Sequence, residues 1–164
     1  MSLNIYHLLP ANNIGGAEIA ASTTLYIKNK FFNFRVIYLF GKIKHKEKYR
    51  LLKNIYSFFL KIKFLLKQDT YILVSSLWKS NLAAIFISLV RKDVKIIPFL
   101  HSQKNWHFVD AITTNIAIFL ANEIWVDSQA TIDGRLKNFC FNHKEKKVRI
   151  ISFMNYRLKK IPFL

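Results

Sequence analysis

Several residue types are scarce in this 164-residue chain, and each shortage excludes a class of site or location. The single cysteine, Cys140, cannot form an internal disulfide, so nothing indicates an oxidising compartment. The five histidines and this cysteine lack metal-ligand spacing, so we expect no metal. Neither a G-x-S-x-G elbow nor a Walker phosphate loop occurs. The longest apolar runs, such as 83–90, are far shorter than the roughly 20 residues that cross a bilayer, and the start lacks a signal peptide.

Acidic residues are also scarce, and this shortage concerns the partners of the chain. The 9 Asp and Glu face 26 Lys and Arg, which gives a formal net charge of +17. Such a charge favours anionic partners, among which nucleic acid, anionic lipid and phosphorylated substrates all qualify. An alternative is a coding bias, because Lys, Asn, Ile and Phe are all abundant.

Apolar runs alternate with helical patterns along the chain. This alternation predicts an α/β fold, a Rossmann-like parallel sheet of about six strands with helices on both faces. Nearly continuous apolar runs, such as 34–40, indicate strands that are buried on both faces. Ser80 and Ser128 are candidate N-caps of two of the helices. The predicted strands are 4–9, 34–40, 70–75, 94–100, 123–127 and 148–151.

A basic helix is predicted near 47–67. One face of its helical wheel carries Lys46, Arg50, Lys53, Ser57 and Lys61. The opposite face carries Leu52, Ile55, Phe59, Ile62 and Leu66. Two interpretations stay open: a core helix with a solvated charged face, or a helix that lies on an anionic membrane through Lys46, Arg50, Lys53 and Lys61.

Chemistry is expected beyond the carboxyl ends of the strands, where open parallel sheets bind ligands. The candidate segments are 12–16, 75–80, 101–107 and 127–128. Gly15 and Gly16 come just before a helix, in a turn that needs positive φ or close backbone approach. Two interpretations stay open: the turn binds a phosphate through its backbone N–H groups, or it is only a tight turn. His101 contacts a substrate hydroxyl or phosphate, or only loop backbone. Trp78 and Trp106 flank this crevice and either stack on a ring or serve packing.

Five short motifs occur in an order that resembles the N-terminal half of a family 4 glycosyltransferase, which has the two-lobed GT-B fold. They are Ile14-Gly15-Gly16-Ala17-Glu18, Leu77-Trp78-Lys79-Ser80-Asn81, Pro98-Phe99-Leu100-His101, Val126-Asp127-Ser128-Gln129-Ala130-Thr131 and Lys147-Val148-Arg149-Ile150-Ile151. The resemblance covers nearly the whole chain. It implies one lobe over 1–152 and a crossover segment, 153–164, that leads to a C-terminal lobe absent from this sequence.

The resemblance also implies an activity, the retaining transfer of a sugar from a nucleotide-sugar donor to a hydroxyl of a glycan or lipid-linked acceptor. His101 is then the catalytic residue, beside the donor sugar, and Gly15 and Gly16 bind the donor diphosphate. No cofactor or metal is implied, and the chain alone is expected to be inactive. The residues implied for the acceptor are Asn12, Asn13, Glu18, Ser76, Trp78, Lys79, Asn105, Trp106 and Ser128.

Location and assembly complete these expectations. We expect a cytoplasmic protein peripheral to the inner face of the plasma membrane, with self-association through apolar residues near 153–164. The alternative from another functional class is a non-catalytic basic α/β module that binds anionic membrane or nucleic acid. No recognisable nucleic-acid motif favours the second of these ligands.

Overall fold

The computed structural model describes residues 2–11, 15–24, 30–40, 50–136 and 146–151. Within them, six strands form one sheet in the order β2-β1-β3-β4-β5-β6, and every neighbouring pair is parallel. The predicted Rossmann-like α/β fold is therefore confirmed. The strands are β1 (Leu3–Ala11), β2 (Phe32–Phe40), β3 (Tyr71–Ser76), β4 (Lys95–Leu100), β5 (Glu123–Val126) and β6 (Lys147–Ile150).

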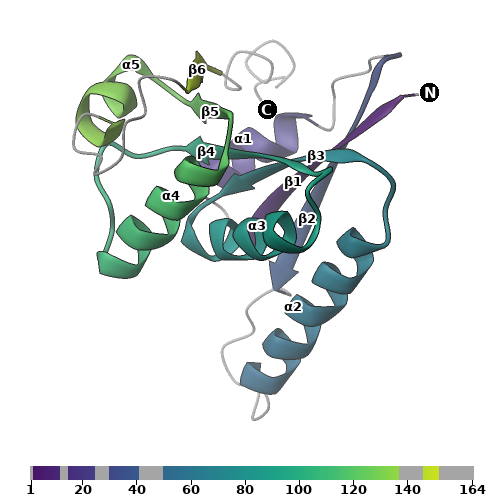
Figure 1. Ribbon diagram of the computed structural model, residues 1–164. Helices are drawn as coiled ribbons and strands as arrows, with labels where there is room; N and C mark the ends of the chain where they lie inside the picture. The colour runs from purple at the N-terminus through teal and green to yellow at the C-terminus, as the bar shows by residue number, and fades with distance from the viewer. Residues whose placement is uncertain (1, 12–14, 25–29, 41–49, 137–145, 152–164) are drawn as a thin grey trace, which may run out of the picture.

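Helices cover both faces of the sheet, as the alternating pattern predicted. One helix, α1, lies on one face, and α3 and α4 pack against each other on the opposite face (Figure 1). The helices are α1 (Gly16–Thr24), α2 (Arg50–Leu66), α3 (Trp78–Val90), α4 (Phe108–Leu120) and α5 (Gln129–Thr131), which continues into a π-helical turn, η1 (Ile132–Leu136). Among the described residues, none of these helices is both long enough and apolar enough to cross a membrane.

The sheet is the centre of the core because its strands are apolar on both faces. On the face of α2 and α3, Tyr6, Leu8 and Leu73 pack with Ile62 and Ile87. On the other face, a separate apolar cluster contains Ile5, Val74, Ile97 and Phe99. Side chains alternate across a strand, so β1, β2, β3 and β4 each contribute to both clusters. This two-sided burial explains why the sequence of these strands does not alternate between apolar and polar residues.

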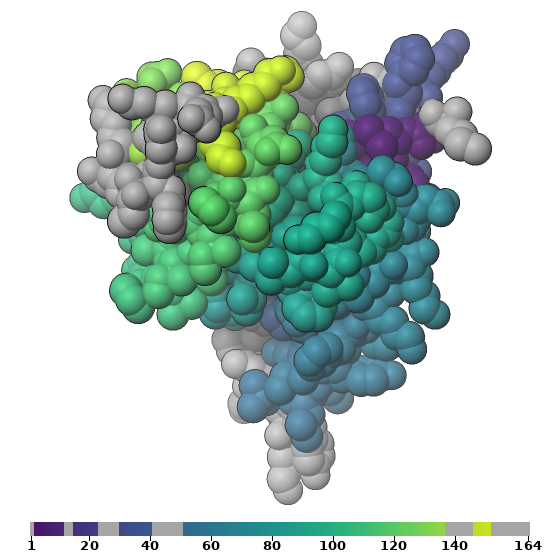
Figure 2. Space-filling view, viewed as in Figure 1, coloured from purple at the N-terminus to yellow at the C-terminus, as the bar shows by residue number. Residues whose placement is uncertain are grey.

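The second helix, α2, projects from the body of the molecule (Figures 1 and 2). Only one side of its later turns contacts the core, through Ile62, Leu65 and the half-buried Phe58. On the free side, Leu52, Tyr56 and Phe59 are 65%, 66% and 62% exposed. The helical wheel was therefore wrong about the orientation of this helix, because it placed Leu52 and Phe59 on the same face as the buried Ile62.

The orientation of α2 also differs from the prediction on its basic face. Ser57 was predicted to lie on the charged stripe, but its Oγ donates a hydrogen bond to the carbonyl oxygen of Leu39 in β2, at 2.9 Å. The stripe therefore runs beside the edge of the sheet. Lys53 and Lys61 are exposed, as predicted. The Arg50 side chain, Lys46 and the apolar residues of 153–164 lie outside the described residues.

One of the two predicted N-caps is confirmed. Ser128 caps α5, since its side chain accepts a hydrogen bond from the backbone N–H of Thr131. Ser80 is not a cap: α3 begins two residues earlier, at Trp78, and its N-cap is Leu77. Ser80 is instead buried inside the helix.

Candidate functional site

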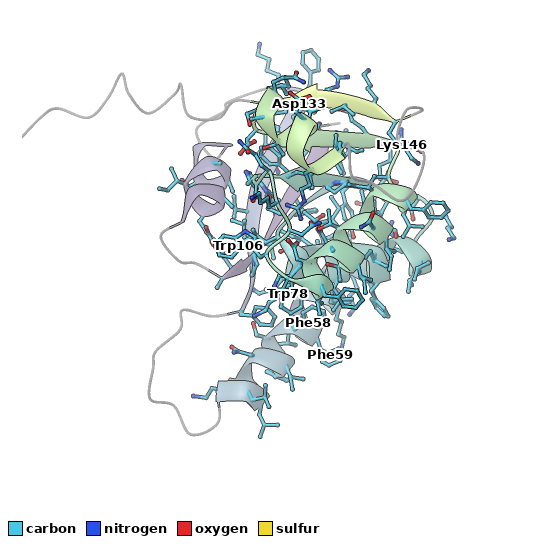
Figure 3. All side chains as sticks on the ribbon, turned by 90° about the vertical axis from the view of Figure 1, so that its left-hand side faces the viewer. Phe58, Phe59, Trp78, Trp106, Asp133 and Lys146 are labelled. Carbon is cyan, nitrogen blue, oxygen red and sulfur yellow. The ribbon has the colours of Figure 1, made fainter. Side chains whose placement is uncertain are left out.

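A cavity of about 300 Å³ opens at the carboxyl ends of the strands, where ligands were expected. Its wall combines aromatic, basic and apolar side chains from four different connections. The residues that line it include Leu77, Trp78, Lys79, His101, Trp106 and Arg135. Figure 3 labels Trp78 and Trp106, which lie near each other, with Phe58 and Phe59 of α2 beyond them.

Behind the cavity wall, one hydroxyl joins two histidines. The Oγ of Ser76, the last residue of β3, lies 2.7 Å from Nε2 of His7 on β1 and 2.9 Å from Nε2 of His101 after β4. A hydroxyl has one proton to donate and two lone pairs that accept, so Ser76 can donate to at most one ring and accepts from the Nε2–H of the other. At least one of the two rings therefore carries its proton on Nε2. This arrangement orients the ring of His101 at the cavity.

Burial keeps both rings neutral. Desolvation by burial and, to a smaller extent, the nearby His101 together lower the pKa of His7 to about 3. The pKa of His101 falls to about 4, mainly through burial; Asp127 opposes this shift and Arg135 adds to it. A neutral imidazole with so low a pKa is a poor proton acceptor at neutral pH. His101 can therefore orient a ligand group by hydrogen bonding more readily than it can remove a proton.

The turn between Ser76 and α3 is strained. Leu77 has φ 69° and ψ 157°, a region of the backbone map that is populated almost entirely by glycine. Its carbonyl oxygen accepts hydrogen bonds from the N–H groups of Ser80 and Asn81, at 3.1 and 3.0 Å, and so begins the helix. Strain of this kind clusters at ligand-binding sites. Here it turns the chain sharply between Ser76 and Trp78, both of which belong to the site.

The loop after β4 is held by a reciprocal cap at the start of α4. The Nδ1 atom of His107 accepts the N–H of Asp110 at 3.1 Å, and the Asp110 carboxylate accepts the N–H of Trp106 at 3.0 Å. These two bonds fix the backbone on both sides of the Trp106 side chain, which is 80% exposed. A large indole in solvent at the mouth of a cavity is available for stacking.

Asp110 also forms a buried ion pair with Arg135 of η1. Nη2 of Arg135 donates to both carboxylate oxygens, at 3.1 and 3.0 Å, and to Oγ1 of Thr114 at 3.1 Å. Gly134 allows η1 to approach this closely, because a Cβ there would lie 2.9 Å from the carbonyl oxygen and the Cβ of Gln103. The loop and η1 are thus fixed against each other at the cavity.

Aromatic and cationic contacts connect the cavity rim to α2. The Nζ atom of Lys79 lies 5.2 Å from the ring centre of Trp78 and 5.4 Å from that of Phe40. Phe40, at the end of β2, stacks on Phe58 of α2, with ring centres 6.1 Å apart. Through Phe58, α2 therefore lies close to Lys79 and the rim of the cavity.

The glycine turn before α1 differs from its prediction. Neither Gly15 nor Gly16 has a positive φ, and a Cβ on Gly16 would meet no atom within 4 Å. A Cβ on Gly15 would collide with Oε2 of Glu18, so this carboxylate lies over the start of the helix. An acidic side chain there stabilises the helix dipole and opposes a bound phosphate. The expected need for positive φ is wrong, and at these two glycines the open space above Gly16 is what suits a ligand.

The structure thus brings together only part of the predicted site. Trp78, Lys79, His101 and Trp106 line the cavity, and Ser76 lies directly behind it. Asn105 is exposed but does not line it, and Ser128 is occupied as a helix cap. Asn12 and Asn13 lie outside the described residues.

Sequence reasoning missed His7, Asp110 and Arg135. The spacing of His107 and Asp110, three residues apart, is that of a capping box and was the one available indication. In the sequence, His7 looks like any other buried residue of a strand. No pattern in the sequence indicates that Arg135 pairs with Asp110.

Metal binding and known relatives add nothing to this site. Across the described ranges, no group of three or more His, Cys, Asp or Glu side chains is placed to hold a metal ion. A second cavity, of about 540 Å³, lies near the start of β4 and β5, at the opposite end of the strands from His101. Lys92, Lys95 and Lys147 are among the residues that line it.

In comparisons with known proteins, no family model matches the chain and no curated protein matches it.

Proposed function

We propose that this chain is the acceptor-binding lobe of a retaining glycosyltransferase, which transfers a sugar from a nucleotide-sugar donor to a hydroxyl of a glycan or lipid-linked acceptor. The observation that carries the proposal is the cavity at the carboxyl ends of the strands, with His101 in its wall and two indoles beside it. Its position is the one at which open α/β sheets bind ligands. The order of the five sequence motifs supports the same assignment.

The chemistry of the wall suits a sugar. Indole rings offer flat apolar surfaces for the C–H face of a pyranose, and His101, Lys79 and His107 offer polar atoms for its hydroxyls. His101 acts in this proposal by orienting a hydroxyl, because its low pKa makes it a weak base at neutral pH. A second lobe grips the donor, since transfer needs groups that converge on the departing diphosphate from both sides of a cleft.

Tryptophan fluorescence tests this proposal on the full chain. Two of the three tryptophans, Trp78 and Trp106, line the cavity; Trp125 does not, and its Nε1 donates to Glu123 instead. In a Trp125→Phe variant, the remaining emission therefore reports on the cavity. We expect saturable changes on adding glycans or lipid-linked sugars, and their loss when Trp106→Ala is added. An unchanged emission across free sugars, oligosaccharides, lipid-linked sugars and nucleotide sugars would overturn the proposal.

A specific observation also supports a membrane location. The free side of α2 exposes Leu52, Tyr56 and Phe59, and the exposed Lys63 and Lys67 belong to the same side of the helix. Apolar side chains flanked by lysines are typical of helices that lie in the interface of an anionic bilayer. In this proposal α2 rests on the membrane and presents the adjacent cavity to a lipid-linked acceptor. This replaces the predicted contact through Lys46, Arg50, Lys53 and Lys61.

A further inference from the structure

Arg135 is the feature of the cavity that the proposed function does not use. It is only 8% exposed, yet it forms part of the cavity wall. Its Nη2 atom is fully engaged by Asp110 and Thr114. Its Nε–H is buried and has no hydrogen-bond partner among the described residues. An unpaired buried donor on a charged group is costly, and native structures resolve such cases with a bound water, ion or ligand.

The ion pair with Asp110 does not explain the free donor. Asp110 already accepts hydrogen bonds from the Trp106 N–H and the Thr114 hydroxyl, besides those from Nη2. Its carboxylate therefore needs nothing more from the guanidinium. The free Nε–H is one charged hydrogen-bond donor, and it suits one oxygen of a phosphate or a carboxylate.

The charges around the cavity also favour an anion. Lys79 and Arg135 carry positive charges in its wall, and Asp110 carries the one negative charge among the residues that line it. His101 is neutral, because burial holds its pKa at about 4. The wall therefore has one net positive charge in a partly enclosed space, where electrostatic attraction is stronger than in water.

We propose that the cavity binds a sugar that carries an anionic oxygen group, phosphate or carboxylate, and that the Nε–H of Arg135 donates a hydrogen bond to this group. The sugar ring then lies against Trp78 and Trp106, at the mouth of the same cavity. The inference rests on the proposed function and deepens it, because it names the chemical class of the acceptor. Binding alone tests it, so its outcome is separate from any assay of sugar transfer.

The first experiment uses NMR of the wild-type chain. The Nε–H of Arg135 gives a signal that Arg135→Lys removes, which assigns it. We expect this signal to shift saturably on adding glucose 6-phosphate or glucuronate, and to stay in place with glucose. A response to only one of the two anionic sugars decides between phosphate and carboxylate and supports the proposal. No response to either, or an equal response to glucose, would overturn it.

The second experiment measures affinity in variants. Arg135→Lys keeps the charge beside Asp110, and so preserves folding, but lacks the planar fork. We expect it to weaken the binding of glucose 6-phosphate or glucuronate, whichever binds, by roughly ten- to a hundredfold, the effect of one lost hydrogen bond to a charged group. Arg91→Lys is the matched control, because Arg91 pairs with Asp93 and does not line the cavity. Equal losses in both variants, or no loss in Arg135→Lys, would contradict the inference.

UDP separates the two sources of phosphate in the proposed reaction. An acceptor phosphate at Arg135 predicts that UDP leaves the Nε–H signal in place and does not compete with the anionic sugar. Competition by UDP at this arginine would assign the site to the donor and overturn the acceptor assignment.

Discussion

His7 and His101 come from different strands, and each bonds through Nε2 to the same hydroxyl oxygen, that of Ser76, at 2.7 and 2.9 Å. Because this hydroxyl can donate to at most one of them, the hydrogen bonds of the two rings are linked through Ser76. A buried histidine thereby helps to orient the ring of His101 at the cavity. Burial disfavours the charged form of both rings, which makes the fold sensitive to acid.

The first prediction is a loss of stability between pH 6.5 and about 4. Burial lowers the pKa of His7 to about 3 and that of His101 to about 4, from an ordinary value of 6.5. In this window the unfolded chain binds protons that the folded chain does not, so the free energy of unfolding falls as the pH is lowered. We expect a slope of up to roughly 2.7 kcal/mol per pH unit from the two groups, which is about 1.36 kcal/mol for each.

Urea titrations across this pH range check the slope. His101→Gln keeps a hydrogen-bonding atom near Ser76 and removes one titrating ring, so it should roughly halve the slope. The wild type and His101→Gln share all nine Asp and Glu side chains, so the difference between their two slopes reports on His101. A slope that is the same in His101→Gln would show that other groups cause the acid sensitivity.

The second prediction concerns the strained turn at Leu77. At an ordinary position, glycine is less stable than alanine by about 0.5–1 kcal/mol. At φ 69° and ψ 157° the order should reverse, because glycine adopts this conformation without strain. We expect Leu77→Gly to be more stable than Leu77→Ala by about 1 kcal/mol.

Both variants lose the contacts of the Leu77 side chain with Leu9, Ala17 and Ala21, so their difference isolates the backbone. Thermal unfolding of the pair gives the sign directly. A more stable alanine variant would show that the turn carries no strain.

The third prediction is that α2 docks on anionic vesicles through its exposed apolar side. Tyr56→Ser with Phe59→Ser should reduce co-sedimentation with phosphatidylserine vesicles by about tenfold or more, because two large side chains no longer enter the bilayer. Lys63→Gln with Lys67→Gln should weaken binding mainly at low salt.

The matched control is Phe86→Ser with Leu89→Ser, because these α3 residues are 50% and 57% exposed but lie on another surface. Equal losses in the control would show that exposed apolar area alone, without α2, explains vesicle binding. Tight binding to single-stranded RNA with none to vesicles would favour the nucleic-acid alternative instead.

The orientation of α2 also shows where sequence reasoning ends. The wheel correctly identified a helix with two chemically different sides, since that depends on local spacing. It could not show that α2 projects from the sheet, which leaves Leu52 and Phe59 largely exposed. Six strands were predicted well because two-sided burial leaves continuous apolar runs, a property visible in each segment alone.

The site itself was only half predictable, for a related reason. Trp78, His101 and Trp106 follow strands directly, so the topology alone brings them to one edge. Arg135 reaches the cavity only because η1 is π-helical and Gly134 lets it approach Gln103. Such pairings depend on tertiary packing between segments, and no local pattern in one sequence encodes them.

The last prediction tests whether the turn before α1 binds the donor diphosphate. Glu18 places its carboxylate over Gly15, at the positive end of the α1 dipole. A diphosphate there would have to approach this negative charge. The repulsion between two like charges at close range costs about 1 kcal/mol even in water. If the turn is the seat, Glu18→Gln should strengthen UDP binding by about fivefold, although the helix loses about 0.5 kcal/mol of dipole stabilisation.

Gly16→Ala gives the opposite test at the same place. The new methyl group meets no protein atom within 4 Å, so the fold should be unharmed and α1 stabilised by up to about 1 kcal/mol. A diphosphate in the open space above Gly16 would collide with it, so UDP binding should weaken while thermal stability is kept. Glu123→Gln, which removes the same charge beside Arg149, controls for net charge. If Glu18→Gln and Glu123→Gln change UDP affinity equally, or Gly16→Ala leaves it unchanged, the glycines serve only the turn.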